Sequence, residues 1–266
     1  MQMLSRRSVI AAVLASAPAL AFVRTPVRAS DQILLRAVYY RDFRPYSFFD
    51  EKEGRMRGIL IDLMGVLGEA CGYAMTHEGF PWARAQHMVA NDAADALCCP
   101  ITEQRSEYVY FAPTIVTPLA EAHLFVTVDN PRADALRAVR SKEGLYDFSA
   151  VDFIGNSSGE HIWKDHPQRL TVRNIQQILK MLLAGRADFY YADPLVTWIQ
   201  MAELGLLDRF FSIPADYVTK GHRGAMSFGL RKTYPDAQAI VARVEEAIRT
   251  EITPDLHDQV IARYTM

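Results

Sequence analysis

Apolar segments of strand length alternate with segments of helical periodicity in two successive blocks of this 266-residue chain. The first block begins at residues 33–38, and the second begins at residues 150–154, after Asn130-Pro131. Alternating strands and helices are typical of α/β domains, in which ligand loops follow the carboxyl ends of the strands. We therefore predict an α/β protein with two lobes.

The first block predicts four strands and two helices. The first helix begins at Gly58, has its apolar positions at helical spacing, and stops at Gly72; the second begins at Pro81, which suits a first helical turn, and runs to Val89. Strands are expected at 33–38, 73–78, 95–99 and 123–128, with a turn-rich segment at 40–46, a hairpin-like loop at 51–57 and a turn at 102–105.

The second block repeats the alternation. A strand at 150–154 leads into a small-residue loop, 155–159, and a helix; Asn174 is expected to cap a further helix that stops at Gly185. The remaining elements are expected to be strands at 188–192 and 225–230 and helices at 194–204, 235–251 and 253–264. Both blocks contain Ala-Asp directly before a strand, at Asp95 and at Asp188, which indicates two related lobes or a chance likeness of two α/β units.

The first 29 residues read as a signal peptide. Arg6 and Arg7 precede an apolar run, 9–23, that is too short to span a membrane. Val27-Arg28-Ala29 offers a cleavage site, and Ala19-Leu20-Ala21 is a second candidate. The pair of arginines fits either a general secretion (Sec) signal or a twin-arginine (Tat) signal. The first cysteine is Cys71, so a lipid-anchored lipoprotein is not expected and the mature chain is predicted to be periplasmic.

Charge and composition exclude several classes of protein. Residues 1–29 hold four arginines and no acid, so the remaining chain has 25 basic and 31 acidic residues and a formal charge of −6. That balance argues against nucleic acid or an anionic membrane as a partner. Neither HExxH nor Cys/His spacing occurs, and we predict no metal and no cofactor. Cys71, Cys98 and Cys99 are expected to be buried small hydrophobes, with a disulfide from Cys71 to either of the others as the alternative.

An ordered set of short motifs resembles the family 3 extracellular solute-binding proteins, the amino-acid-binding components of bacterial import systems. The motifs are Phe43-Arg44-Pro45-Tyr46-Ser47-Phe48, Gly58-Ile59-Leu60-Ile61-Asp62-Leu63-Met64, Ala94-Asp95-Ala96, Ile101-Thr102-Glu103-Gln104-Arg105 through Phe111-Ala112-Pro113, and Gly185-Arg186-Ala187-Asp188 through Asp193. The resemblance implies a type 2 periplasmic-binding fold, with two α/β lobes joined by two hinge strands. It places lobe 1 at 30–122 and 223–266 and lobe 2 at 123–222. It further implies a monomeric, non-enzymatic protein that delivers a small-molecule ligand, an amino acid or related carboxylate, to a membrane ABC permease.

The resemblance also assigns roles to individual residues. Arg105 matches the arginine that binds a ligand carboxylate, for which a guanidinium fork is well suited. Ser157, Ser158 and Gly159 match the loop whose backbone amides cradle that carboxylate. A surface ion pair for Arg105 and a plain helix cap for the serine loop are the structural alternatives.

Asp193 matches the acid that pairs with a ligand amino group, with an ordinary helix N-cap as the alternative. The resemblance places further ligand contacts on the aromatic residues and on the turn before Arg105: Phe43, Tyr46, Phe80, Trp82, Arg84 and Thr102. For Arg84, a helix-surface position is the simpler account.

Two residues depart from the family pattern. Pro100 stands where many relatives carry a hydroxyl facing the ligand, and Cys98 stands at a position often held by glycine. Both leave the carboxylate clamp in place and argue against a standard amino acid, so the expected ligand is an amino-acid derivative or another small carboxylate. An enzyme of the cyclohexadienyl dehydratase type, with Glu160 or His161 as its acid or base, is one alternative function. An orphan ligand sensor and a redox role for Cys98-Cys99 are two others.

Overall fold

The computed structural model describes residues 33–220 and 224–265, apart from the side chains of Ser157 and Ser158. The predicted signal peptide, residues 1–29, lies outside the described residues. In the described part of the chain, no helix combines the length and apolar character that a membrane crossing requires.

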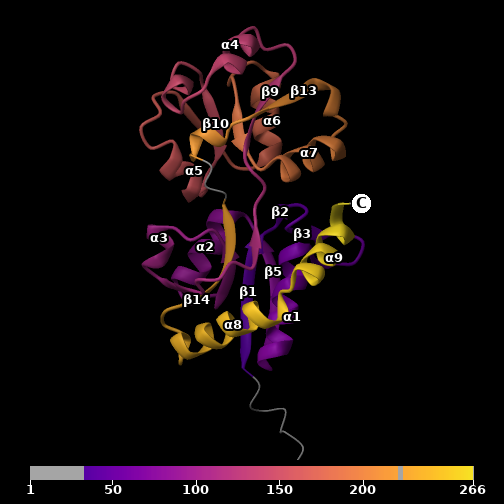
Figure 1. The fold of residues 1–266 in the computed structure, drawn as a ribbon, viewed down its shortest axis with the longest axis vertical. Helices are drawn as coiled ribbons and strands as arrows, with labels where there is room; N and C mark the ends of the chain where they lie inside the picture. Colours follow the sequence, from indigo (N-terminus) through magenta and orange to yellow (C-terminus); the bar gives the residue numbers. More distant parts are fainter. Residues whose placement is uncertain (1–32, 221–223, 266) are drawn as a thin grey trace, which may run out of the picture. The chain divides into compact units, whose positions relative to one another are not determined.

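The largest sheet has the strand order β5-β1-β6-β14-β7, with β8 also paired to β14. Its first three strands are parallel, whereas β14 runs antiparallel to its neighbours and enters the sheet from far along the chain (Figure 1). The strands are β1 (Leu34–Tyr40), β5 (Ala74–Phe80), β6 (Ala96–Cys99), β7 (Val109–Phe111), β8 (Thr117–Pro118) and β14 (Ala225–Arg231).

Helices cover both faces of this sheet. On one face lie α1 (Ile59–Cys71), α8 (Ala237–Glu251) and α9 (Pro254–Thr265), and on the other lies α2 (Trp82–Ala90). Because side chains alternate along a strand, the adjacent Cys98 and Cys99 of β6 belong to different hydrophobic clusters, Cys98 with α1 and α8, Cys99 with α2. All three cysteines are free and buried, which confirms the prediction that they are buried small hydrophobic residues.

A small antiparallel sheet of β2 (Asp42–Phe43), β3 (Ser47–Asp50) and β4 (Arg55–Arg57) precedes α1. The predicted hairpin-like loop is the β3–β4 connection. Gly58 has a φ of 128°, and a Cβ there would collide with the carbonyl oxygens of Pro45 and Tyr46. Those two carbonyls accept the first backbone N–H groups of α1 instead, at 3.0 and 2.9 Å, so the start of the helix holds Tyr46 in place.

A second set of sheets is built on β9 (His123–Thr127), which lies antiparallel between β12 (Tyr190–Ala192) and β13 (Phe210–Pro214). Strand β10 (Ala150–Phe153) pairs in parallel with β11 (Arg169–Val172), and a parallel bridge joins Ala150 to Phe189 just before β12. The helices in this stretch are α4 (Ala133–Ala138), α5 (Ser157–Ile162), α6 (Ile175–Leu183) and α7 (Pro194–Glu203), with 3-10 turns at Glu143–Leu145, Leu207–Arg209 and Asp216–Val218. The short helix α3 (Glu103–Ser106) belongs to the earlier part of the chain.

Most predicted elements appear within a few residues of their expected bounds. Gly72 ends α1 in the left-handed conformation, and the Asn174 side chain accepts the Gln177 N–H at 2.9 Å to cap α6. Seven strands of two to five residues each were not predicted as strands, because so short a segment carries little periodicity: β2, β3, β4, β7, β8, β11 and β13. Sheet membership changes between β8 and β9 and again before β14; the residue boundaries of the two lobes remain a prediction.

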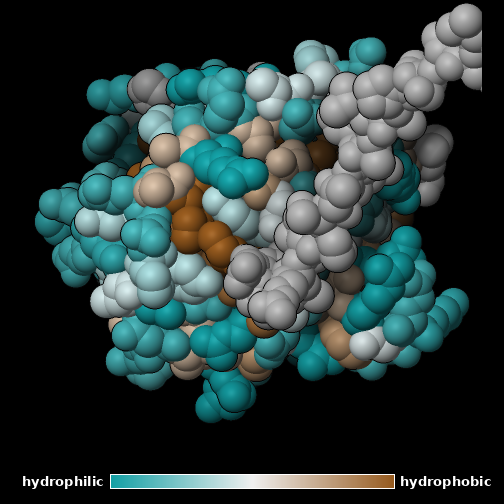
Figure 2. Space-filling model, turned by 90° about the horizontal axis from the view of Figure 1, so that it is seen from below, coloured by the Kyte–Doolittle hydropathy of each residue, from teal (hydrophilic) through white to brown (hydrophobic). Residues whose placement is uncertain are grey.

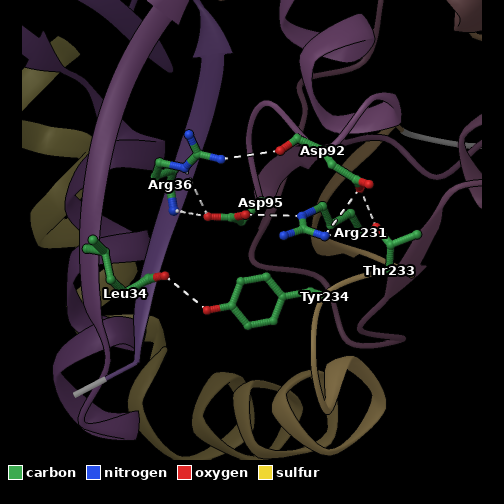
Figure 3. A network of polar contacts seen from close by, with 7 residues as sticks. All are labelled: Leu34, Arg36, Asp92, Asp95, Arg231, Thr233 and Tyr234. Carbon is green, nitrogen blue, oxygen red and sulfur yellow. Dashed lines mark hydrogen bonds and ion pairs between the residues drawn. The ribbon is translucent and has the colours of Figure 1, made fainter. Parts of the chain in front are cut away.

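A polar network ties the start of β1 to the turn before β6 and to the end of β14 (Figure 3). Buried Asp95 accepts the backbone N–H of Arg36 at 2.9 Å and the Nε–H of Arg231 at 3.1 Å. Arg231 also reaches Asp92, and Thr233 donates to the same carboxylate. The face of the molecule shown in Figure 2 is mainly hydrophilic, with a few hydrophobic residues gathered near its centre, as is usual for a globular protein.

Candidate ligand-binding site

A cleft opens where β1, β6, β10 and β12 end, as expected for ligand sites at the carboxyl ends of strands. Its lining is mostly aromatic and apolar. Among the described residues it contains one guanidinium, Arg105, and one carboxylate, Asp193. The aromatic residues that line it are Tyr39, Tyr40, Phe43, Trp82, Phe153, Tyr190 and Tyr191.

Arg105 is the buried cation of the cleft. It lies in α3, whose N-cap Thr102 accepts the Arg105 N–H at 3.3 Å, and only 1% of the residue is exposed. Its Nε donates to the Gln86 side chain at 2.9 Å, its Nη1 donates to the Pro100 carbonyl at 2.7 Å, and the guanidinium lies 5.1 Å from the Trp82 ring. Within residues 33–220 and 224–265, no carboxylate lies within ion-pair distance of it. A surface ion pair is therefore not its role.

Asp193 is both a cleft residue and the N-cap of α7. Its Oδ1 accepts the backbone N–H groups of Leu195 and Val196 at 2.8 and 3.3 Å. Its Oδ2 accepts the Ala120 N–H at 3.0 Å and the Tyr46 hydroxyl at 3.2 Å. Burial raises the pKa of this carboxyl, and the four hydrogen bonds act in the opposite direction.

The small-residue loop forms the beginning of α5. The Asn156 side chain caps the helix by accepting the Gly159 N–H at 3.2 Å, and its Nδ2 donates to buried Asp152 at 2.9 Å. Asp152 in turn pairs with Arg169 at 3.1 Å. Gly159 lines the cleft, and a Cβ at that position would collide with the Asp152 carboxylate. The backbones of Ser157 and Ser158 form the first turn of this helix.

The remaining predicted site residues divide into two groups. Phe43 and Trp82 line the cleft. Four others are not among its described lining residues: Tyr46, Phe80, Arg84 and Thr102. Tyr46 is buried and bonded to Asp193, Thr102 caps α3, and exposed Arg84 packs its guanidinium 5.0 Å from the Phe80 ring.

Sequence reasoning missed Gln86. This α2 side chain accepts from Arg105 and, through Nε2, donates to the Gly155 carbonyl before α5 at 2.9 Å. No local signal marks a glutamine inside a helix as a bridge between a distant arginine and a distant backbone carbonyl. Tyr190 and Tyr191 were also missed, although their place at the end of a predicted strand was a usable signal.

The two cysteines of the cleft are neutral thiols. Burial raises the pKa of Cys98 well above its ordinary value and that of Cys99 to about 11, although nearby Arg105 partly counteracts the effect at Cys99. The described residues contain no cluster of His, Cys, Asp or Glu that would hold a metal ion.

Two sets of strands flanked by helices, with a cleft at the strand ends, are the architecture of the periplasmic-binding fold. The chain belongs to family 3 of the bacterial extracellular solute-binding proteins. The sequence model of that family matches residues 35–255. No curated protein sequence matches the chain significantly.

Solved structures show the same fold. A histidine kinase sensor domain with similarity to periplasmic binding proteins is 16% identical, has a TM-score of 0.71 and covers 88% of this chain and 96% of its own. A second structure is an amino acid ABC transporter substrate-binding protein from Streptococcus pneumoniae, bound to L-arginine. It is 15% identical with a TM-score of 0.69, and the match covers 87% of this chain and 94% of that protein. A third is an ancestral amino acid-binding protein, a precursor of cyclohexadienyl dehydratase. It is 20% identical with a TM-score of 0.67, and the match covers 88% of this chain and 95% of that protein. The predicted type 2 periplasmic-binding fold is confirmed.

Proposed function

We propose that this protein is a periplasmic solute-binding protein that captures a small carboxylate, an amino acid or a related acid, for import by a membrane ABC permease. It acts without catalysis and as a monomer. Its lobes, at 30–122 with 223–266 and at 123–222, close on the ligand. Family membership and the resemblance of the N-terminal segment to an export signal support this assignment.

The observation that carries the proposal is the buried guanidinium of Arg105. A buried cation without a counter-ion is costly, and a ligand anion is the partner that the described residues do not supply. Protein oxygens take the Nε–H and one N–H of Nη1. The guanidinium also hydrogen-bonds the Cys99 thiol, and the N–H groups that remain on Nη1 and Nη2 are the donors that would bind a ligand carboxylate.

Closure on the ligand is supported by three contacts between segments that we assign to different lobes. Tyr46 donates to Asp193 and Gln86 donates to the Gly155 carbonyl, as described above. Outside the cleft, Arg44 pairs with Glu203 at 2.9 Å. These contacts exist only when the lobes are together, so a ligand that touches both lobes favours the closed state.

A thermal-shift screen of amino acids and small carboxylates, followed by calorimetry, tests the proposal, because a ligand that binds the folded state raises the melting temperature. Arg105→Ala should lower the affinity of the best ligand by about tenfold or more. The control is Arg186→Ala, in which an exposed arginine is removed. Equal affinity in wild type and Arg105→Ala, or no binding anywhere in the panel, would contradict the proposal.

The positions of Glu160 and His161 argue against the alternative function, an enzyme of the dehydratase type. Glu160 and His161 are exposed, and neither is among the described lining residues of the cleft. Asp193, the one carboxylate among the described lining residues, accepts hydrogen bonds from four donors. A general acid or base needs to reach the substrate.

A further inference from the structure

We propose that the cleft prefers aromatic carboxylates without an ammonium group over the corresponding amino acids. This inference rests on the proposed function, since it takes Arg105 as the carboxylate receptor. It names the class of acid from the state of Asp193 and from the chemistry of the lining.

Asp193 has no free position for an ammonium group. A carboxylate offers about four lone-pair sites. All four hydrogen bonds that Asp193 accepts come from the protein, two at each oxygen. Three of the donors are backbone N–H groups, of Ala120, Leu195 and Val196, and they carry no side chain that can turn away.

The fourth donor is also held in place. Tyr46 is only 3% exposed, and its ring stacks on Phe43 with 5.3 Å between ring centres. The carbonyls of Pro45 and Tyr46 accept the first N–H groups of α1, which fixes the backbone beneath the ring. An ammonium group at Asp193 would have to displace this hydroxyl and leave it buried without its acceptor.

The described lining contains no second acid that would serve an amine. Asp193 is its one carboxylate, and Pro100 supplies no hydroxyl; its carbonyl is already the acceptor for Arg105 Nη1. The hydroxyls of the lining, that of Tyr40 among them, carry no charge, so a zwitterionic ligand would recover only part of the hydration of its ammonium group in the cleft. A ligand that carries only the carboxylate avoids that loss.

The body of the cleft suits an aromatic ring. Phe43, Tyr40 and Phe153 form a continuous series, with 6.0 Å between the first two ring centres and 5.5 Å between the last two. Trp82, next to Arg105, adds a further ring to the lining. Ring surfaces of this kind favour stacking with an aromatic ligand.

Calorimetry with 3-phenylpropionate and L-phenylalanine tests the proposal, because the two probes share the ring, the chain and the carboxylate and differ by the ammonium group. Wild-type protein should bind 3-phenylpropionate about tenfold or more tightly than phenylalanine. Butyrate, which lacks the ring, should bind at least about tenfold more weakly than 3-phenylpropionate.

The variant Tyr46→Phe keeps the ring and removes the donor to Asp193. It should bring the affinities for the two probes several-fold closer together, because one Asp193 lone pair becomes free for the ammonium group. If this variant fails to fold, the wild-type comparison decides alone.

Phenylalanine binding as tightly as 3-phenylpropionate in wild type would overturn this inference and leave the proposed function intact. Failure of both probes to bind, while another acid of the panel binds through Arg105, would do the same. The proposed function fails separately, when no carboxylate binds or when Arg105→Ala has no effect.

Discussion

Asp95 and Asp188 make the same hydrogen bond just before two different strands, β6 and β12. Each carboxylate accepts a backbone N–H from the neighbouring parallel segment, Asp95 from Arg36 at 2.9 Å and Asp188 from Ser149 at 2.8 Å. Each carboxylate also forms an ion pair with an arginine: Asp95 with Arg231 and Asp188 with Arg132. The Ala-Asp pair that precedes a strand in both blocks of the sequence thus has the same structural role in each. This shared role favours two related lobes over a chance likeness of two α/β units.

Replacing Asp95 by alanine should destabilise the fold by about 2–4 kcal/mol. The change leaves the Arg36 N–H and the Arg231 guanidinium without their buried acceptor. Exposed Asp92 belongs to the same network, and Asp92→Asn should cost less than about 1 kcal/mol. Urea unfolding of both variants measures the difference; equal midpoints would show that Asp95 has no special role.

Gly159→Ala should destabilise the protein by about 1–3 kcal/mol and weaken ligand binding. The added methyl group collides with the Asp152 carboxylate and forces the start of α5 to move. Gly65→Ala is the matched control within α1, where a Cβ meets no atom within 4 Å. That control should stabilise the protein by about 0.5–1 kcal/mol, because alanine favours the helix. Loss of stability in both variants would contradict this explanation.

Gln86→Leu should lower ligand affinity by about tenfold, since it removes both the acceptor of Arg105 Nε and the donor to Gly155. His87→Leu, at the adjacent exposed position of α2, should leave affinity unchanged. Calorimetry with the best ligand of the screen measures both. A Gln86 variant with wild-type affinity would show that Arg105 is positioned without this bridge.

The native thiols should react very slowly with a thiol reagent at pH 8. A pKa of about 11 for Cys99, against an ordinary 9.0, lowers its thiolate fraction by about 100-fold. Since the folded-state pKa is raised, this group's contribution to stability is complete below pH 9 and is lost as the pH rises through about 11. Unfolding in urea should release three reactive thiols; rapid reaction of the native protein would instead indicate an accessible cysteine.

Local signals in the sequence predicted the regular elements well. The apolar spacing of α1, its stop at Gly72, and the Asn174 cap of α6 each depend on residues within a few positions of one another. Strands β11 and β13 lack such a signal, because pairing with a distant strand, not their own composition, makes them strands.

The candidate site likewise combines features that the sequence predicts with features that depend on contacts between distant segments. The sequence by itself determined which residue types were present, and through its motifs it led to Arg105 and Asp193. Only the tertiary structure decided that Arg105 is buried with Gln86 as its partner and that Asp193 is already satisfied. Tyr46 stands 147 positions from Asp193, and Ala120 stands 73 positions away. A hydrogen bond depends on the distance between atoms in space, which the chain fixes only once its sheets and helices have packed.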